Sequence, residues 1–206
     1  MKKLKIDSSL IFFTILVIIF ILWSILVLRG NLRSLDDQIF SLIHHMHYGW
    51  LTSFFKIITY LGSAVVLGGL VLFVLIFAHN KFIGISMGIN LFLVSMLNLL
   101  LKNIFLIPRP DTITLIEEHG FSYPSGHAMV SLAFYGFAIY LINTKMKASI
   151  MKKIIMGLLV LFIILVGFSR IYLGVHHFSD IIGGYIISLA YLILYIKLDR
   201  KLGVKS

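Results

Sequence analysis

Six long apolar runs constrain this chain more than any other feature of its sequence. A helix needs roughly 20 apolar residues to cross the hydrocarbon core of a bilayer, and these runs reach or approach that length. They are continuous rather than alternating, which favours helices over a β-barrel, since backbone polar groups in lipid must be satisfied internally. We predict an all-α, six-span transmembrane helix bundle, with spans at roughly 10–28, 63–79, 83–105, 126–143, 153–169 and 178–197.

The first apolar run follows three lysines and at first sight resembles a signal peptide. It extends from Leu10 to Leu28, which is long enough to span a bilayer. Instead of a small-residue cleavage site, Arg29 and Arg33 come next. We interpret the run as a retained first span.

Composition excludes several classes of protein. Hydrophobic residues make up 60% of the 206 residues, whereas a soluble domain averages about 45–50%. The chain has no cysteine, which excludes disulfides, thiolate chemistry, thiolate-bound zinc and iron–sulfur clusters. The net charge of +10 does not indicate nucleic-acid binding, because the basic residues fall mostly between apolar runs. The length fits one membrane-embedded domain, residues 1–206.

Residues 34–61 are too polar for a transmembrane span. Asp36 and Asp37 are typical helix-start residues, and the apolar residues after them are mixed with three histidines and Lys56. We predict a short interfacial helical segment after the first span, made of one or two helices. The alternative is that this segment folds back over the bundle.

The distribution of lysine and arginine predicts the topology. With six spans both termini share one side, and 12 of the 18 basic residues then lie on that side. The positive-inside rule places both termini in the cytoplasm and the opposite loops outside the cell membrane.

Three polar segments lie together on the predicted outer side. They stand at the end of the third span, at the start of the fourth, and between the fifth and sixth. Charge close to hydrocarbon is costly and indicates a functional site. The candidate site residues in these segments are Lys102, Arg109, Ser125, Gly126, His127, Arg170, His176 and Asp180.

These segments carry the elements of a phosphate site. The guanidinium groups of Arg109 and Arg170 match phosphate oxygens, and Lys102 adds a point charge. Ser125 and Gly126 should open a helix, whose free N–H groups and dipole attract an anion. Taken alone, Arg170 is equally well explained as a snorkelling anchor and Ser125 as a simple N-cap.

The histidines supply a reaction. His176 and Asp180 are four residues apart, so on a helical turn the carboxylate can hold one ring nitrogen and leave the other free to attack phosphorus. His127 would protonate the leaving alkoxide and then activate water. The pattern predicts two displacements through a phosphohistidine, with the cations stabilising the transferring group.

The same residues resemble the three-part signature of the type 2 phosphatidic acid phosphatase superfamily, in its membrane lipid phosphatase branch. The resemblance covers roughly residues 62–195 and has no departure at a signature position. It implies a helical core, metal-free catalysis, His176 as nucleophile, Asp180 as its partner and His127 as acid and base. It also implies phosphate binding by Lys102, Arg109, Ser125, Gly126 and Arg170. The three parts are Lys102-x6-Arg109-Pro110, Pro124-Ser125-Gly126-His127 and Ser169-Arg170-x5-His176-x3-Asp180.

Within this family three lipid substrates compete. Phosphatidylglycerol phosphate is the first choice, undecaprenyl diphosphate the second and phosphatidic acid the third, an order that rests on family analogy. Halide oxidation is a remote alternative. Vanadate mimics the phosphate transition state and can occupy such a pocket, but the relatives that use it are soluble. A non-catalytic lipid-binding protein is disfavoured, since all the signature residues are present. The expected partners are a membrane lipid phosphate and the bilayer, without cofactor or metal, and the oligomeric state stays open.

Two further polar clusters have weaker interpretations. His44, His45 and His47 suggest a metal site, but carboxylates do not complete it, so an interfacial helix is favoured. Glu117 and Glu118 precede Ser125 and are interpreted as part of a solvated loop, with a role in shaping the site entrance as the alternative.

Overall fold

The chain folds into helices throughout the part that the structure describes, residues 7–201 of a computed structural model. That range contains no strand, which confirms the all-α fold class. The helices are α1 Ser8–Leu28, α2 Arg33–His44, α3 Gly49–Tyr60, α4 Ala64–Phe77, α5 Lys81–Phe105, α6 Gly126–Lys145, α7 Ile150–Tyr172 and α8 Phe178–Lys201.

Five of the helices in this range, α1, α5, α6, α7 and α8, are long and apolar enough to cross a membrane singly. The predicted span 63–79 is shorter than expected: α4 has only 14 residues, which gives about 21 Å of helix. It forms a sixth crossing only together with α3, at a bend of 52°. The bend occurs where the Oγ of Ser63 accepts the N–H of Val66 and caps α4.

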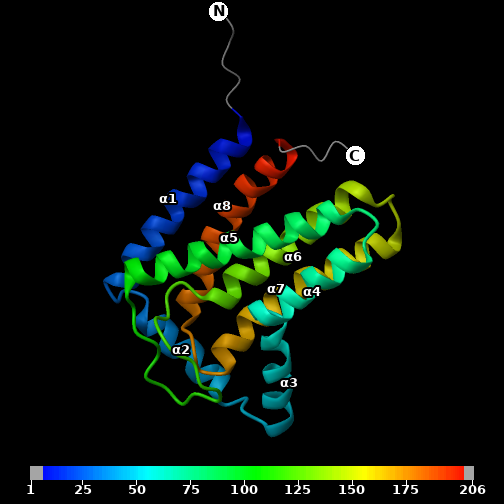
Figure 1. Ribbon diagram of the computed structural model, residues 1–206. Coiled ribbons are helices and arrows are strands. Elements are labelled where there is room, and N and C mark those ends of the chain that lie inside the picture. The colour runs from blue at the N-terminus through cyan, green and yellow to red at the C-terminus, as the bar shows by residue number, and fades with distance from the viewer. Residues whose placement is uncertain (1–6, 202–206) are drawn as a thin grey trace, which may run out of the picture.

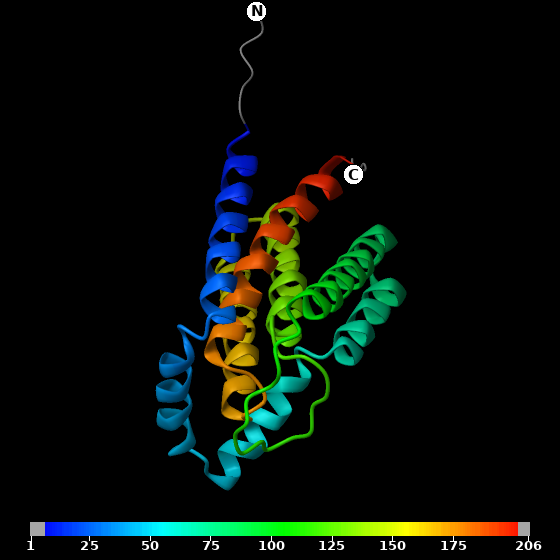
Figure 2. The ribbon, with the colours of Figure 1, turned by 90° about the vertical axis from the view of Figure 1, so that its left-hand side faces the viewer.

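The long helices pack around α6 and α8. Helix α8 packs against α1 and α6, α6 also packs against α5 and α7, and α4 pairs with α5 (Figures 1 and 2). The start of α1 and the end of α8 lie at the same end of the bundle, where Lys197 Nζ is 2.5 Å from Asp7 Oδ2. The loop between α5 and α6 lies at the opposite end, together with α2 and α3.

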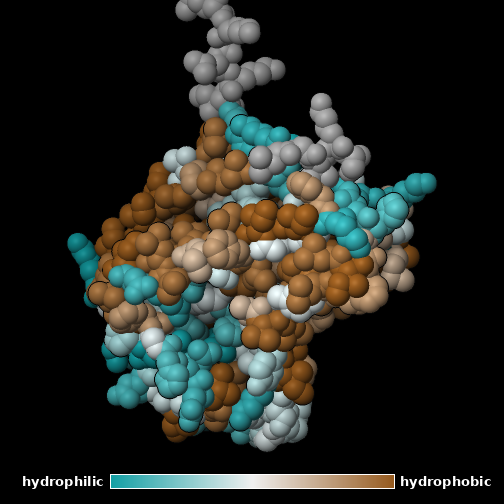
Figure 3. Space-filling view, in the orientation of Figure 1, coloured by the Kyte–Doolittle hydropathy of each residue, from teal (hydrophilic) through white to brown (hydrophobic). Residues whose placement is uncertain are grey.

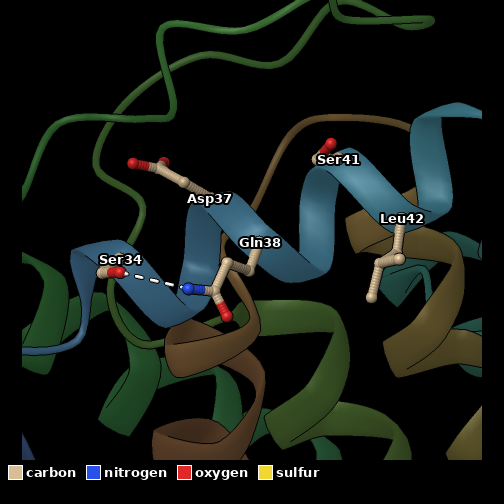
Figure 4. Close-up of a pocket in the computed structure, with 5 residues that line it drawn as sticks. All are labelled: Ser34, Asp37, Gln38, Ser41 and Leu42. Atoms are coloured by element: carbon tan, nitrogen blue, oxygen red, sulfur yellow. Dashed lines mark hydrogen bonds between the residues drawn. The ribbon is translucent and has the colours of Figure 1, made fainter.

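Residues 34–61 form two short helices, as predicted, and these helices also pack against the bundle. Helix α2 contacts α7 and α8, and α3 contacts α7. Asp36 and Ile43 are buried on the inner side of α2. Its outer side carries Asp37 and Gln38 beside a shallow pocket, and Gln38 Nε2 donates to Ser34 Oγ at 3.4 Å (Figure 4). This two-sided pattern is typical of a helix at a membrane interface.

Two buried apolar clusters support the bundle. One lies between α4, α5, α6 and α8 and includes Val94 and Phe137, whereas the other lies closer to α2 and α3 and includes Phe55 and Tyr172. Hydrophobic side chains cover the middle of the surface, and hydrophilic ones gather toward the lower end around α2 and the α5–α6 loop (Figure 3). The buried polar residues described next belong to this lower end.

Candidate active site

The end of the bundle that carries the α5–α6 loop brings the predicted site residues to one region. Arg170 and His176 are only 1% and 2% exposed, and Asp180 and Ser125 are fully buried. Such burial of charged and polar groups indicates a functional site when they are paired. The elements that supply them are the last turn of α5 (Lys102), the loop after α5 (Arg109), the start of α6 (Ser125, Gly126, His127), the last turn of α7 (Arg170), the α7–α8 loop (His176) and the first turn of α8 (Asp180).

The predicted pairing of His176 with Asp180 is present. Nδ1 of His176 lies 3.2 Å from Oδ2 of Asp180, which also accepts the N–H of His177 at 2.9 Å. Ser122 was missed in the sequence: its hydroxyl donates to the same Oδ2 and lies 3.1 Å from Nδ1 of His176. The carboxylate and the hydroxyl together fix the orientation of the imidazole ring.

The other ring nitrogen of His176 faces Arg109. The distance from Nη1 of Arg109 to Nε2 of His176 is 3.3 Å. A guanidinium can only donate, so Nε2 must accept and the ring proton must be on Nδ1, toward Asp180. Burial, with the charges of Arg170, Arg109 and Lys102, holds the pKa of His176 well below its ordinary value. The imidazole is therefore neutral at neutral pH, with Nε2 unprotonated.

Two of the three predicted cations, Arg109 and Lys102, donate hydrogen bonds to backbone carbonyl oxygens. Arg109 donates to the carbonyl oxygens of Val175 at 2.9 Å and His119 at 3.0 Å. Lys102 donates through Nζ to the carbonyl oxygen of Phe121. These hydrogen bonds connect the α5–α6 loop to the end of α5 and to the α7–α8 loop.

Glu118 corrects the interpretation of its segment as a solvated loop. Its Oε2 is 3.3 Å from Nη2 of Arg109, and its Oε1 pairs with Nη2 of Arg170. The carboxylate thus joins the two arginines that were predicted to bind phosphate. A sequence pattern could not indicate this contact, because Glu118 and Arg170 are 52 residues apart.

The start of α6 presents polar groups without partners. Ser125 occupies the N-cap position, but its side chain makes no capping hydrogen bond, so the simple N-cap explanation is wrong. Its buried Oγ has no hydrogen-bond partner among residues 7–201. Asn98 fixes the turn before it, since its amide donates to the carbonyl oxygen of Pro124 at 3.0 Å. His127 follows in the first turn, within electrostatic range of His176 and Arg170.

Two glycines of α8 allow the loop before α6 to approach closely. A Cβ at Gly183 would lie 2.5 Å from Oη of Tyr123, and one at Gly184 would lie 3.1 Å from the carbonyl oxygen of Ser125. Larger residues would displace the loop that carries Ser122 and Ser125.

The first three helices supply supporting contacts that the sequence did not reveal. Asp36 of α2 accepts two hydrogen bonds from Ser179, one from its N–H at 2.8 Å and one from its Oγ at 2.7 Å. Burial raises the pKa of the Asp36 carboxyl, and these hydrogen bonds oppose that effect. Thr59 of α3 accepts from Nη1 of Arg170 at 2.7 Å. The Trp23 indole of α1 donates to the carbonyl oxygen of Ser179 at 3.0 Å.

The histidines of residues 44–47 have a structural contact. His47 Nε2 donates to the carbonyl oxygen of Tyr172 at 2.9 Å, and its ring stacks edge-on against that tyrosine. The centroids of the His44 and His47 rings are 4.7 Å apart. The residues that the structure describes contain no group of three or more His, Cys, Asp or Glu residues placed to hold a metal ion.

Comparison with known proteins gives consistent matches. A family model described as PAP2 superfamily matches residues 82–203, which include all three signature segments. Phosphatidylglycerophosphatase B of Bacillus subtilis (strain 168) is 29% identical over 191 residues, which cover 91% of this chain and 94% of that protein. An undecaprenyl-diphosphatase of Sulfolobus acidocaldarius is 27% identical over 185 residues, 85% of each chain. The crystal structure of a transmembrane PAP2-type phosphatidylglycerolphosphate phosphatase from Bacillus subtilis aligns with a TM-score of 0.84 at 27% identity, over 94% of this chain and 98% of that one.

Proposed function

This chain belongs to the PAP2 superfamily and is a multi-pass membrane phosphatase, and we propose that it hydrolyses a lipid phosphate through a phosphohistidine formed on His176. The observation that carries the proposal is the state of the imidazole. Nδ1 is held by Asp180 and Ser122, while Nε2 is unprotonated beside Arg109. A buried, oriented and neutral histidine next to cations has the properties of a nucleophile for an anionic phosphoryl group.

The reaction proceeds in two displacements. In the first, Nε2 of His176 bonds to phosphorus as the bond from phosphorus to the lipid oxygen breaks, and His127 gives its proton to the leaving alkoxide. In the second, His127 takes a proton from water, the water oxygen attacks phosphorus, and the bond to His176 breaks. The products are the dephosphorylated lipid and inorganic phosphate, and both histidines return to their starting states.

The phosphate oxygens are bound by the groups that surround His176. Arg109 and Arg170 neutralise charge on the equatorial oxygens, Lys102 adds a third cation, and Ser125 with the N–H groups at the start of α6 completes the cradle. In many phosphoryl-transfer enzymes metal ions have this role. Because side-chain cations have that role in the proposed mechanism, it requires no metal ion, and activity should survive treatment with EDTA.

The proposed topology places the site at the extracytoplasmic face. The first residues of α1 and the last residues of α8 share the end of the bundle opposite the site. The positive-inside rule applied to the basic residues near that end favours a cytoplasmic location for both termini.

Phosphatidylglycerol phosphate is the proposed substrate, and the name of the Bacillus subtilis relative supports it. Undecaprenyl diphosphate is the second candidate, supported by the name of the Sulfolobus relative. Phosphatidic acid is the third. A panel of the three lipids, each presented in vesicles to the purified protein with and without EDTA, discriminates among them by phosphate release.

Replacement of the nucleophile tests the mechanism. We expect His176→Ala to lower phosphate release by about a thousandfold or more, because no other group can form the covalent intermediate. His45→Ala, which removes an exposed histidine of α2's C-terminal end, is the matched control and should retain activity. Rapid quenching under alkaline conditions with a radiolabelled substrate should trap phosphate on the wild-type protein and not on His176→Ala. Near-normal turnover by that variant would refute the mechanism.

A further inference from the structure

The carboxylate of Glu118 occupies one terminal nitrogen of each phosphate-binding arginine. One oxygen pairs with Arg170, and the other lies 3.3 Å from Nη2 of Arg109. A carboxylate and a phosphate both offer a guanidinium group two charged oxygens that it can bind in a bidentate manner. A lipid phosphate that binds both arginines through these nitrogens must therefore displace Glu118.

The arginines do not depend on Glu118 for their placement. Arg109 also donates to the carbonyl oxygens of Val175 and His119, at 2.9 and 3.0 Å. Arg170 also donates to Oγ1 of Thr59 at 2.7 Å. These neutral acceptors remain when the carboxylate leaves, so both guanidinium groups stay in the site with their charge uncompensated.

The site also holds more donors than Glu118 satisfies. Within residues 7–201, the Nε atoms of Arg109 and Arg170 and the Oγ of Ser125 are buried without a hydrogen-bond partner. A carboxylate has two oxygens, whereas a phosphomonoester has three terminal oxygens and a second negative charge at neutral pH. Buried donors that lack partners carry a desolvation cost, which a phosphomonoester can relieve and Glu118 does not.

Glu118 is also more accessible to water than the arginine with which it pairs most closely. It lies in the loop between α5 and α6, outside any helix, and its side chain is 26% exposed, whereas that of Arg170 is 1% exposed. The side chain of Glu118 is therefore already in contact with solvent, whereas that of Arg170 is not.

We propose that Glu118 is an intramolecular competitor that sets the affinity threshold of the phosphate site, a role that rests on the proposed function. Competition from a tethered carboxylate weakens the apparent affinity for every anion by the same factor. Membrane phospholipids are mostly phosphodiesters with one negative charge, and they surround the site in large excess over any phosphomonoester. The threshold leaves these weak binders unbound, whereas the dianionic phosphomonoester, which can also reach the unpartnered donors, binds above it. Because the factor is common to all anions, Glu118 sets the absolute affinity of the site and not the ratio between ligands.

Direct binding measurements test this proposal without requiring turnover. The full-length protein in detergent is titrated calorimetrically with inorganic phosphate, as the dianion, and with dimethyl phosphate, as a monoanionic diester. In Glu118→Gln we expect the dissociation constants of both probes to fall by about tenfold, because the charged carboxylate no longer competes with the anion for the two arginines. Dimethyl phosphate should then inhibit lipid hydrolysis by this variant at concentrations that leave the wild type unaffected.

The neighbouring residue provides a matched control. Glu117→Gln removes the same charge from an exposed side chain of the same loop and should leave both dissociation constants unchanged. Glu118→Ala should show the same direction as Glu118→Gln and serves if the glutamine variant does not yield folded protein. Unchanged or weaker binding of phosphate by the Glu118 variants would overturn the proposal, and weaker binding would make Glu118 a clamp for the arginines.

The two proposals fail in different ways. If phosphate binding does not change in Glu118→Gln while His176→Ala still abolishes lipid hydrolysis, only the role of Glu118 is wrong. If the wild type releases phosphate from no lipid in the panel, the proposed function is wrong, and the titration with inorganic phosphate still decides the competition by Glu118.

Discussion

Residues 82–203, which match the family model, and helices α1 to α3, which lie outside it, both reach the site but contact different parts of it. The matched region supplies the groups that surround the reacting phosphate in the proposed mechanism. Helices α1 to α3 contact these groups and their neighbours: Thr59 bonds Arg170, and Trp23 and Asp36 bond Ser179. Part of the support for the site is thus encoded outside the matched region, whereas Ser122 and Asn98 support the site from within it.

The comparison teaches that the signature residues are not sufficient to define the site. Arg170 is placed partly by Thr59, and Ser179, the residue before Asp180, is bonded to both Asp36 and Trp23. If helices α1 to α3 only anchored the chain in the bilayer, changes in their polar side chains would leave catalysis intact. Three substitutions test this alternative.

The largest effect is expected at Asp36. Asp36→Ala leaves the N–H and hydroxyl of Ser179 without acceptors in a buried place, and the first turn of α8, which carries Asp180, loses a fixed point. We expect kcat to fall about tenfold, with KM for the lipid nearly unchanged, because the orientation of His176 is affected more than phosphate binding. Steady-state kinetics on the purified protein measure both parameters.

Two further variants separate positioning from folding at this residue. Asp36→Asn keeps one acceptor oxygen and should recover most of kcat. Asp37→Ala removes the adjacent carboxylate, which points away from the bundle on the outer side of α2 (Figure 4), and should behave as wild type. A wild-type kcat in Asp36→Ala would show that α2 has no part in positioning His176, the proposed nucleophile.

A smaller effect is expected at Thr59. Thr59→Val keeps the shape of the side chain but removes the acceptor for Nη1 of Arg170. Because the guanidinium is buried and less firmly held, we expect the inhibition constant of inorganic phosphate to rise about fivefold, with a smaller fall in kcat. Thr59→Ser should restore phosphate binding, and Ser53→Ala, an exposed hydroxyl on the same helix, is the control. An unchanged inhibition constant in Thr59→Val would limit the role of α3 to packing.

The local geometry of the candidate site could be predicted from the sequence because the spacing of its residues within each segment is local. His176 and Asp180 are one helical turn apart, and Ser125 and His127 begin a helix, so a linear pattern contains their geometry. The apolar runs likewise predict the helices, because a segment in lipid must satisfy its own backbone. Only α4 was expected to be longer than it is: its start was predicted at residue 63, but it ends at Phe77, and hydropathy does not reveal that it crosses only together with α3, at a bend of 52°.

The supporting residues could not be predicted, because their partners are distant in the chain. Asp36 and Ser179 are 143 residues apart, and Thr59 and Arg170 are 111 apart. Such contacts depend on how α2 and α3 fold back over the bundle, and hydropathy contains no information about that packing. The only hint of these contacts in the sequence was that Asp36 and Thr59 are polar residues in a partly apolar segment. For Asp36, its expected position at a helix start already accounted for that polarity.

The smallest effect is expected at Ser24 of α1 and concerns stability more than catalysis. Its Oγ lies 2.8 Å from Oη of Tyr123 and donates to the carbonyl oxygen of Phe20. Ser24→Ala should lower the free energy of unfolding by about 1 kcal/mol, and the midpoint of thermal unfolding in detergent by roughly 2–4 °C, with activity within about twofold of wild type. Thr14→Val removes only a bond to the preceding turn of the same helix, so it isolates the contribution of the Tyr123 contact. Equal destabilisation by the two variants would mean that α1 stabilises the site loop through apolar packing alone.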